Sequence, residues 1–318
     1  MPTINLSRAR GCLFGQIAGD NLGALVEFTT AKEIDRRYPE GPRLLADGGI
    51  WNILAGQPTD DSEMALALAR AMLRDGGWSE KGVGAAYLAW GDSHPFDMGG
   101  TTAAGLSALA AGRRPSSDSQ ANGALMRAAP IGIRYAGDPV TAAEVAEADA
   151  ELTHPSGVCR AANRAFVAAI AVGVGGGDPK AMVARARAAL GGPDSAAVAK
   201  RIDAALRGER PADYQHQMGW VLTAFQNAFY WLAAGTPLEE AVVATVRCGG
   251  DTDTNAAIVG ALLGAAQGEE ALPVQWRDLI RHCRPGRGTL KPRPEEYWPH
   301  DAEALAGALA GMAGEVAA

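Results

Sequence analysis

Two short acidic segments have the residue types of a divalent-cation site. The first is Thr59-Asp60-Asp61, and the second is Asp251-Thr252-Asp253-Thr254, which follows two glycines. Together they offer four carboxylates and the hydroxyls of residues 59 and 254, and such oxygen ligands suit Mg²⁺ or Mn²⁺ better than zinc. Six protein oxygens with water could hold two ions about 3.5–4 Å apart, as in many hydrolases. The pattern therefore predicts a dinuclear Mg²⁺ or Mn²⁺ site.

Helix capping is the alternative explanation for each segment taken alone. Threonine and aspartate are good N-cap residues, acids in a first turn favour the helix dipole, and Asp60-x-x-Glu63 matches a capping box. A cap needs only one side-chain oxygen, however, and each segment carries more acid than that. Neighbouring carboxylates repel one another unless a cation lies between them, so the excess favours metal binding.

The elements that would position these acids are helices. Met64, Leu68 and Met72 recur at helical spacing directly after the first acidic segment, and this helix should end near Asp75-Gly76-Gly77. Similar patterns cover residues 141–152, 158–174, 180–190, 196–206, 220–233, 238–246, 255–266 and 302–312. No break between them is long or polar enough to be an interdomain linker. We therefore expect one all-α domain over residues 1–318, a compact orthogonal bundle of many helices.

The least periodic stretch of the chain is residues 90–126, which is rich in glycine, aspartate and asparagine. It contains Asp97-Met98-Gly99-Gly100-Thr101-Thr102 and Ala121-Asn122-Gly123-Ala124. In a helical protein, a long connection of this composition is where a binding site usually lies. We expect a loop here that carries a binding site.

Composition excludes several classes of protein. The chain has 318 residues, of which 47% are hydrophobic and 20% charged, and about a fifth are alanine, which favours helix. The net charge of -7 gives no basic face for nucleic acid. Apolar runs at 165–174 and 256–266 are shorter than the about 20 residues that span a bilayer. The first residues lack the features of a signal peptide, and the four cysteines show no metal spacing. We expect a cytoplasmic protein with reduced thiols and no membrane partner.

Six segments, in order along the chain, match motifs of one known family. They are residues 11–24 (G-x-x-x-G-x-x-x-G-D-A-L-G-A) followed by Glu27-Phe28, residues 59–61, residues 97–102 (D-I-G-N-T-T), residues 122–127 (N-G-x-x-M-R), residues 153–155, and residues 249–254. On these motifs the chain resembles the ADP-ribosylglycohydrolase family. That family includes dinitrogenase reductase-activating glycohydrolases and the ADP-ribosylarginine and ADP-ribosylserine hydrolases.

The resemblance implies a compact all-α fold with two Mg²⁺ or Mn²⁺ ions and a role for each matching residue. The implied metal ligands are Thr59, Asp60, Asp61, Asp251, Asp253 and Thr254. The implied catalytic residues are Glu27 and Asp97. The implied substrate-binding residues are Gly99, Gly100 and Thr101 beside the reacting ribose, Ser119, Asn122 and Gly123 at the diphosphate, and His154 near the ADP portion. Tyr135 and Tyr214 are both candidates to stack on adenine.

The implied activity is hydrolysis of the N-glycosidic bond of ADP-ribosylated protein side chains by a monomeric enzyme, with arginine-linked ADP-ribose preferred. Gly100 stands where the family has asparagine, which leaves the leaving group open, so serine- or other O-linked ADP-ribose and a free ADP-ribosyl small molecule remain alternatives. Another alternative is a relative that has lost catalysis and only binds ADP-ribose or serves a structural role. An isoprenoid synthase is disfavoured, because Met64 replaces the last acid of D-D-x-x-D and no basic cluster is present.

Overall fold

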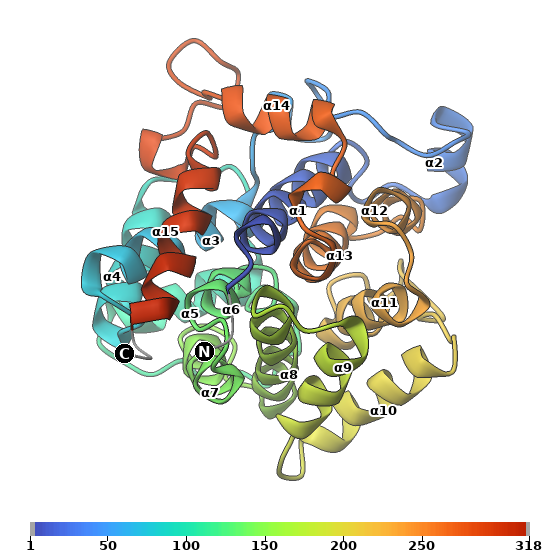
Figure 1. Cartoon of the computed structure of the whole chain (residues 1–318). Helices are drawn as coiled ribbons and strands as arrows, with labels where there is room; N and C mark the ends of the chain where they lie inside the picture. The colour runs from blue at the N-terminus through green and yellow to red at the C-terminus, as the bar shows by residue number, and fades with distance from the viewer. Residues whose placement is uncertain (1–3, 316–318) are drawn as a thin grey trace.

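The computed structural model describes residues 4–315, and no β-strand occurs within this range. Fifteen α-helices and two 3-10 helices follow one another in a single compact body (Figure 1), which confirms the all-α prediction. The α-helices are α1 (Leu6–Ala24), α2 (Ala31–Arg37), α3 (Asp60–Asp75), α4 (Glu80–Asp92), α5 (Gly100–Ala110), α6 (Ala129–Arg134), α7 (Pro139–Glu151), α8 (Gly157–Val174), α9 (Pro179–Ala188), α10 (Ser195–Leu206), α11 (Val221–Ala234), α12 (Leu238–Val246), α13 (Thr252–Gln267), α14 (Val274–His282) and α15 (Ala302–Glu315). The 3-10 helices are η1 (Glu269–Ala271) and η2 (Glu295–Tyr297).

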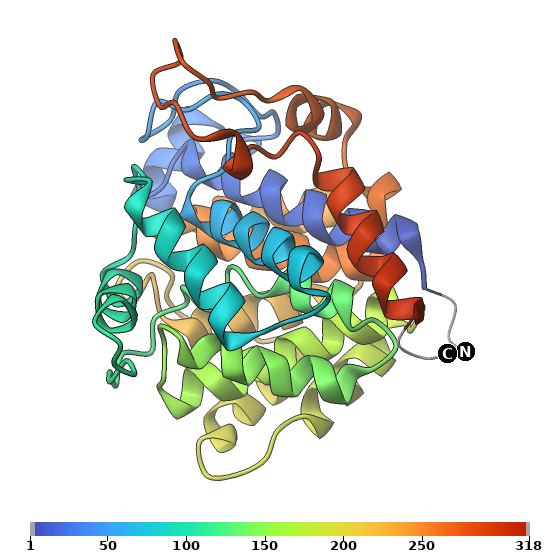
Figure 2. The ribbon, with the colours of Figure 1, turned by 90° about the vertical axis from the view of Figure 1, so that its left-hand side faces the viewer.

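Helices α1 and α13 form the centre of the molecule and lie side by side (Figure 1). Both are buried almost all round, because other helices cover the sides that do not face the partner. Helices α8, α11 and α12 pack on α13, and α3, α6, α14 and α15 pack on α1. Figure 2 shows α1 crossing the molecule behind α3. The two acidic segments are thus attached to elements of the deepest core.

Glycines allow the backbones of α1 and α13 to touch. A Cβ built on Gly15 would lie 2.2 Å from the carbonyl oxygen of Gly260, and one built on Gly19 would lie 2.2 Å from that of Ala256. At Gly23 the nearest atom would be Cα of Asp253, at 2.3 Å. We call this line of contacts (Gly11, Gly15, Gly19 and Gly23 against residues 253–268) the glycine seam. It fixes how far the end of α1 lies from the start of α13.

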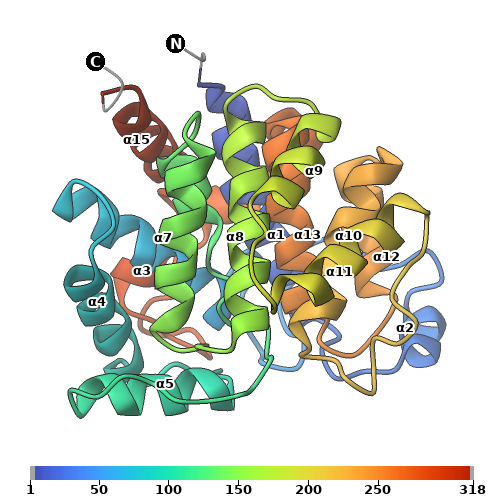
Figure 3. The ribbon, with the colours of Figure 1, turned by 90° about the horizontal axis from the view of Figure 1, so that it is seen from below.

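Helices α7 and α8 lie side by side, and α5 crosses their direction at one edge (Figure 3). By length and composition α8 could cross a membrane, although we expected every apolar run to be too short. However, 78% of this helix is buried inside the fold. That burial is typical of a core helix.

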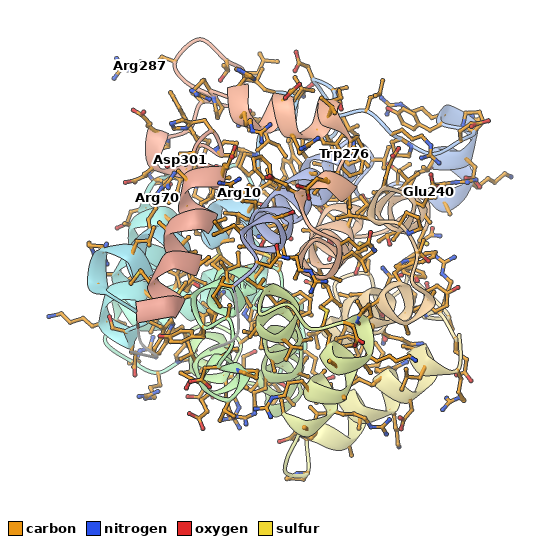
Figure 4. The ribbon with its side chains drawn as sticks, viewed as in Figure 1. Arg10, Arg70, Glu240, Trp276, Arg287 and Asp301 are labelled. Carbon is orange, nitrogen blue, oxygen red and sulfur yellow. The ribbon has the colours of Figure 1, made fainter. Side chains whose placement is uncertain are left out.

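Side chains of the C-terminal segment contact α3 and the N-terminal third of the chain. Arg70 of α3 pairs with Asp301 at 2.9 Å, and both are labelled in Figure 4. The buried Trp276 of α14 donates its indole N–H to the carbonyl of Arg43 at 2.8 Å. These contacts hold α3 and the chain before it against the C-terminal segment.

Helix α5 corrects one expectation. We predicted that residues 90–126 form a loop, but residues 100–110 are helical. The segment GTTAAGLSALA is apolar and small on all sides, so it shows no amphipathic spacing, and its flanking glycines resemble loop residues. Residues 90–92 are also helical, as the end of α4, whereas residues 93–99 and 113–119 are irregular as predicted.

Candidate metal and substrate site

A cavity of about 240 Å³ lies where the ends of several elements meet. It brings together most of the residues singled out from the sequence, which come from the turn after α1, the starts of α3, α5 and α13, and the loops before α6 and α8. The predicted residues that line it are Glu27, Asp60, Asp97, Gly99, Gly100, Thr101, Asn122, Gly123, His154, Asp251, Asp253 and Thr254. Thr59, Asp61 and Ser119 do not line it. Ser119 is one step removed, with its hydroxyl 2.8 Å from that of Thr101.

The two acidic helix starts meet, as predicted. The hydroxyl of Thr254 donates to Asp61 Oδ2 at 3.3 Å across 193 residues of chain, and the hydroxyl oxygen of Thr59 lies 3.2 Å from the same oxygen. Oxygen atoms of Glu27, Asp251 and Asp253 lie within 4.8 Å of one another. Five acids and two threonines from three elements are therefore gathered at one end of the cavity.

Two glycines turn the chain into this site. Gly249 and Gly250 have φ of +72° and +79°, a conformation that other residues rarely adopt, and Gly250 accepts a hydrogen bond from the N–H of Phe28 at 2.8 Å. The turn before α13 is thereby tied to the turn after α1. This contact, together with the glycine seam, places Glu27 beside Asp251 and Asp253.

Capping does not explain the acids at the start of α3. The side chains of Thr59 and Asp251 make no cap hydrogen bond to their own helices. Instead Asp20 of α1 accepts from the N–H groups of Thr59 and Ser62 at 3.1 Å. Glu63, the other half of the suspected capping box, is buried in an ion pair with Arg293 at 2.7 Å. The carboxylates at 60 and 61 are therefore not accounted for by helix capping.

Asp20 was missed as a site residue, although it lies in the matched segment 11–24. It is fully buried and also accepts from the Thr59 hydroxyl at 2.9 Å, so it orients a candidate ligand. Burial raises its pKa to about 7, although hydrogen bonds from Ser62 and Thr59 oppose the rise. Asp20 is the only acid of that segment, and its place in the matched motif was the only signal that could have indicated this role.

The crowded carboxyls of the acidic cluster must either take up protons or face cations. Burial, followed by the charges of neighbouring carboxylates, raises the pKa values of Asp60, Asp61 and Asp253 well above their usual range. Asp61 Oδ1 is buried and has no hydrogen-bond partner in the described chain. Buried carboxylates that lack a cation are costly. Their oxygens are also the ligands that Mg²⁺ and Mn²⁺ prefer, so the residues present fit divalent cations.

Glu27 and Asp97 line the same cavity. Burial and the charges of Asp97 and Asp251 raise the pKa of Glu27 to about 8, and burial raises that of Asp97 to about 6. The indole N–H of Trp51 donates to Glu27 Oε2 at 2.6 Å and fixes one carboxylate oxygen. Nothing in the sequence pointed to Trp51. Carboxyls with pKa values near neutrality can give or take protons there.

Without divalent cations, the protein is expected to lose stability as the pH rises from about 5 to about 8. The pKa values of Glu27 (about 8), Asp20 (about 7) and Asp97 (about 6) lie above those of the unfolded chain, so the native state binds more protons. The free energy of unfolding therefore decreases through this range, and Tm should fall by roughly 5–10 °C. Thermal unfolding in a chelator measures the change. The fall should be smaller in Glu27→Gln, and a Tm that rises towards pH 8 would contradict the prediction.

Another part of the cavity lining is made by loops that the sequence only partly indicated. Asn122 donates its amide to Asp251 Oδ2 at 2.7 Å, so this side chain also holds a candidate metal ligand. Its backbone N–H bonds to the carbonyl of Gly219 at 3.0 Å, which brings Met218 and Gly219 into the lining. Met218 and Gly219 were not predicted, because the segment before α11 carries no motif. Neither Tyr135 nor Tyr214 lines this cavity.

Comparison with known proteins gives a consistent result. The sequence model of the ADP-ribosylglycohydrolase family matches residues 1–315. An ADP-ribosyl-[dinitrogen reductase] glycohydrolase of Rhodospirillum rubrum is 29% identical over 274 residues, covering 85% of this chain and 88% of the relative. An ADP-ribosylarginine hydrolase of Pseudomonas putida is 24% identical over 291 residues, covering 88% and 76% respectively.

A solved structure described as an ADP-ribosylglycohydrolase-related protein complex superposes with a TM-score of 0.78 at 27% identity. The match covers 97% of this chain and 98% of the other. Fold, length and sequence therefore agree over nearly the whole described chain. The chain belongs to the ADP-ribosylglycohydrolase family, as its motifs predicted.

Proposed function

We propose that this protein is a divalent-cation-dependent hydrolase that removes ADP-ribose from arginine side chains of proteins. The observation that carries the proposal is the meeting of two acidic helix starts, far apart in the sequence, at one end of a cavity that Glu27 and Asp97 also line. The family supports a glycosidic bond as the target. The names of the relatives support an ADP-ribosylated protein as the substrate.

Two Mg²⁺ or Mn²⁺ ions are proposed to be held by Thr59, Asp60, Asp61, Asp251, Asp253 and Thr254. When bound, such ions supply positive charge that can orient ribose hydroxyls and lower the pKa of water. The Thr59 hydroxyl can donate its hydrogen bond to Asp20 at 2.9 Å, which leaves the lone pairs of the hydroxyl oxygen available to a cation. Asp61 Oδ1 has no hydrogen-bond partner in the described chain, and a bound cation would give it one.

Glu27 and Asp97 are proposed to handle protons. Cleavage of a ribosyl bond passes through an oxocarbenium-like state, and it needs a base for the attacking water and a proton for the leaving group. Trp51 holds Oε2 of Glu27, which leaves Oε1 to act towards the cavity. Asp97 precedes Gly99 and Gly100, where backbone alone lines the cavity and the reacting sugar could approach closely.

An arginine linkage is favoured over other linkages by two observations. One relative is named as an ADP-ribosylarginine hydrolase. The ring of Phe28 lines the cavity, is 57% exposed and is held at a φ of +60°. A planar guanidinium can stack on such a ring. A Cβ at Gly100 would meet nothing within 4 Å, so this position leaves room around the leaving group.

The test is incubation with peptides that carry ADP-ribose on arginine, serine or threonine. Release of ADP-ribose from the arginine peptide alone, measured by mass spectrometry and abolished by a chelator, is the expected result. Faster release from the serine peptide would overturn the arginine assignment but leave the hydrolase intact. No release from any peptide with Mg²⁺ or Mn²⁺ present, despite tight binding of ADP-ribose, would indicate a binding protein instead.

Glu27→Gln is expected to lower kcat by about 10²–10⁴-fold and leave cation binding nearly unchanged. The amide keeps the shape of the side chain but can neither take up nor release a proton in the working pH range. Steady-state kinetics and calorimetric titration of Mn²⁺ measure the two effects separately. Glu33→Gln on the exposed surface of α2 is the matched control. Lost Mn²⁺ binding in Glu27→Gln would instead make Glu27 a ligand.

A further inference from the structure

A buried polar network runs from Arg127 to the cavity wall at His154. Arg127 is fully buried, with Nε 3.1 Å from Asp149 Oδ2 and the guanidinium stacked on the ring of Tyr87, 4.4 Å from its centroid. Its Nη1 donates to the hydroxyl of Thr153 at 2.8 Å. That hydroxyl lies 2.8 Å from Nδ1 of His154.

The direction of each hydrogen bond follows from what each group can donate. A guanidinium has donors only, so the oxygen of Thr153 must accept from Arg127. The hydroxyl has one proton left, and His154 Nδ1 is the only other partner it has within residues 4–315. Thr153 is 1% exposed, so a proton pointing elsewhere would be a buried donor without an acceptor. The hydroxyl therefore donates to Nδ1.

His154 is neutral in this setting. Burial, and then the charge of Arg127, lower its pKa to about 3. A neutral imidazole carries one proton, and a ring that accepts at Nδ1 carries that proton on Nε2.

The Nε2 edge of the ring is open to the cavity. His154 lines the cavity together with Gly123, and a Cβ built on Gly123 would lie 3.0 Å from Nε2. Any side chain at position 123 would thus crowd this edge. No protein acceptor lies within hydrogen-bond distance of Nε2 in the described chain.

We propose that Arg127 and Thr153 are positioning residues that hold His154 as its Nε2–H tautomer, so that one fixed, uncharged hydrogen-bond donor faces the cavity. The donor would bind an acceptor oxygen of ADP-ribose. This identity of the ligand rests on the proposed function, whereas the tautomer does not. Arg127 also reaches the carbonyl of Gly123 at 3.4 Å, so the same side chain holds the loop facing the ring.

Nuclear magnetic resonance of ¹⁵N-histidine-labelled protein tests the tautomer without any ligand. The wild-type spectrum should show Nδ1 of His154 as the unprotonated nitrogen and Nε2 as the protonated one near neutral pH. His154→Gln identifies the signals among those of the five histidines. A proton on Nδ1 in the wild type would overturn the proposal, even if the protein binds and hydrolyses as proposed.

Thr153→Val and Thr153→Ser form the matched pair for function. Valine keeps the shape of threonine but cannot donate, so the ring should populate both tautomers and ADP-ribose affinity should fall by about tenfold. Serine keeps the hydroxyl and should restore the wild-type spectrum and affinity. Mn²⁺ affinity should not change in either variant. A pure Nε2–H spectrum with full affinity in Thr153→Val would contradict the role of Thr153.

The proposed function and the proposed tautomer of His154 can fail independently, and the experiments distinguish the two failures. If the wild type has the Nε2–H tautomer but does not bind ADP-ribose, the proposed function fails and the positioning network stands. If Thr153→Val does not fold, the wild-type and Thr153→Ser spectra still decide the tautomer.

Discussion

Asp253→Asn is expected to abolish tight Mn²⁺ binding and to lower hydrolysis of ADP-ribosylarginine by at least about 10³-fold. The side chain is 1% exposed and lies among Glu27, Asp251 and Asp61, so its charge has no role there unless cations are bound. Bound cations supply several kcal/mol of transition-state stabilisation, which corresponds to about 10²–10³-fold in rate or more. Asparagine keeps the shape but offers a weaker, neutral ligand.

Calorimetric titration of Mn²⁺ and kinetics at rising Mn²⁺ concentration measure this effect, and high concentrations should restore part of the activity. Glu80→Gln is the control, because it also removes an acid from the first turn of a helix, but at an exposed position on α4. Without cations, Asp253→Asn should be at least as stable as the wild type, since a crowded carboxyl is gone. Wild-type Mn²⁺ affinity in this variant would remove Asp253 from the ligand set.

Gly15→Val is expected to destabilise the fold by at least about 3 kcal/mol and to prevent the acidic site from forming. The first added carbon would lie 2.2 Å from the carbonyl oxygen of Gly260, a backbone atom that cannot rotate away. Helices α1 and α13 would have to separate, and Glu27 would move away from Asp253. At a helix position without such a contact, replacing glycine by valine should change the free energy of unfolding little, because valine forms helix at least as well as glycine.

Urea or thermal unfolding measures the stability of this variant, and titration of Mn²⁺ measures the state of the site. Gly307→Val in α15 is the control, since a Cβ there would meet nothing within 4 Å. It should leave Tm within a few degrees of the wild type. Equal stability of Gly15→Val and Gly307→Val would show that the seam is not as close as described.

Amphipathic helices were the part of the fold that the sequence predicted best. The segment 238–246 corresponds to α12, and the helix that begins at Asp60 ends before Gly76, which has a φ of +77°. Helix α1 was not predicted by periodicity. Its residues are buried on every side, so no polar face alternates with an apolar one. The short helices α2 and α6 are too brief for any period to show.

The sequence predicted those residues of the candidate site that lie within its motifs. The acids at 60, 61, 251 and 253 stood out because they exceed what capping needs. Trp51 and Met218 were not predicted, because each reaches the site through contacts between distant elements, and such contacts leave no local pattern. Asn122 shows the same limit, since its bond to Asp251 depends on a fold that no single segment specifies.

The glycine seam also has a consequence for how the chain folds. The hydroxyl of Thr252 donates to the carbonyl of Gly23 at 2.7 Å, and the two residues are 229 positions apart. Bringing them together closes most of the chain into one loop, an entropic penalty that local helix formation does not offset and that slows folding. During synthesis, Asp60 and Asp61 are made long before the acids at 251 and 253. A chain released before α13 is made lacks Asp253 and Thr254, so it should bind no cation at the proposed site, and cation binding there would report that the whole domain has closed.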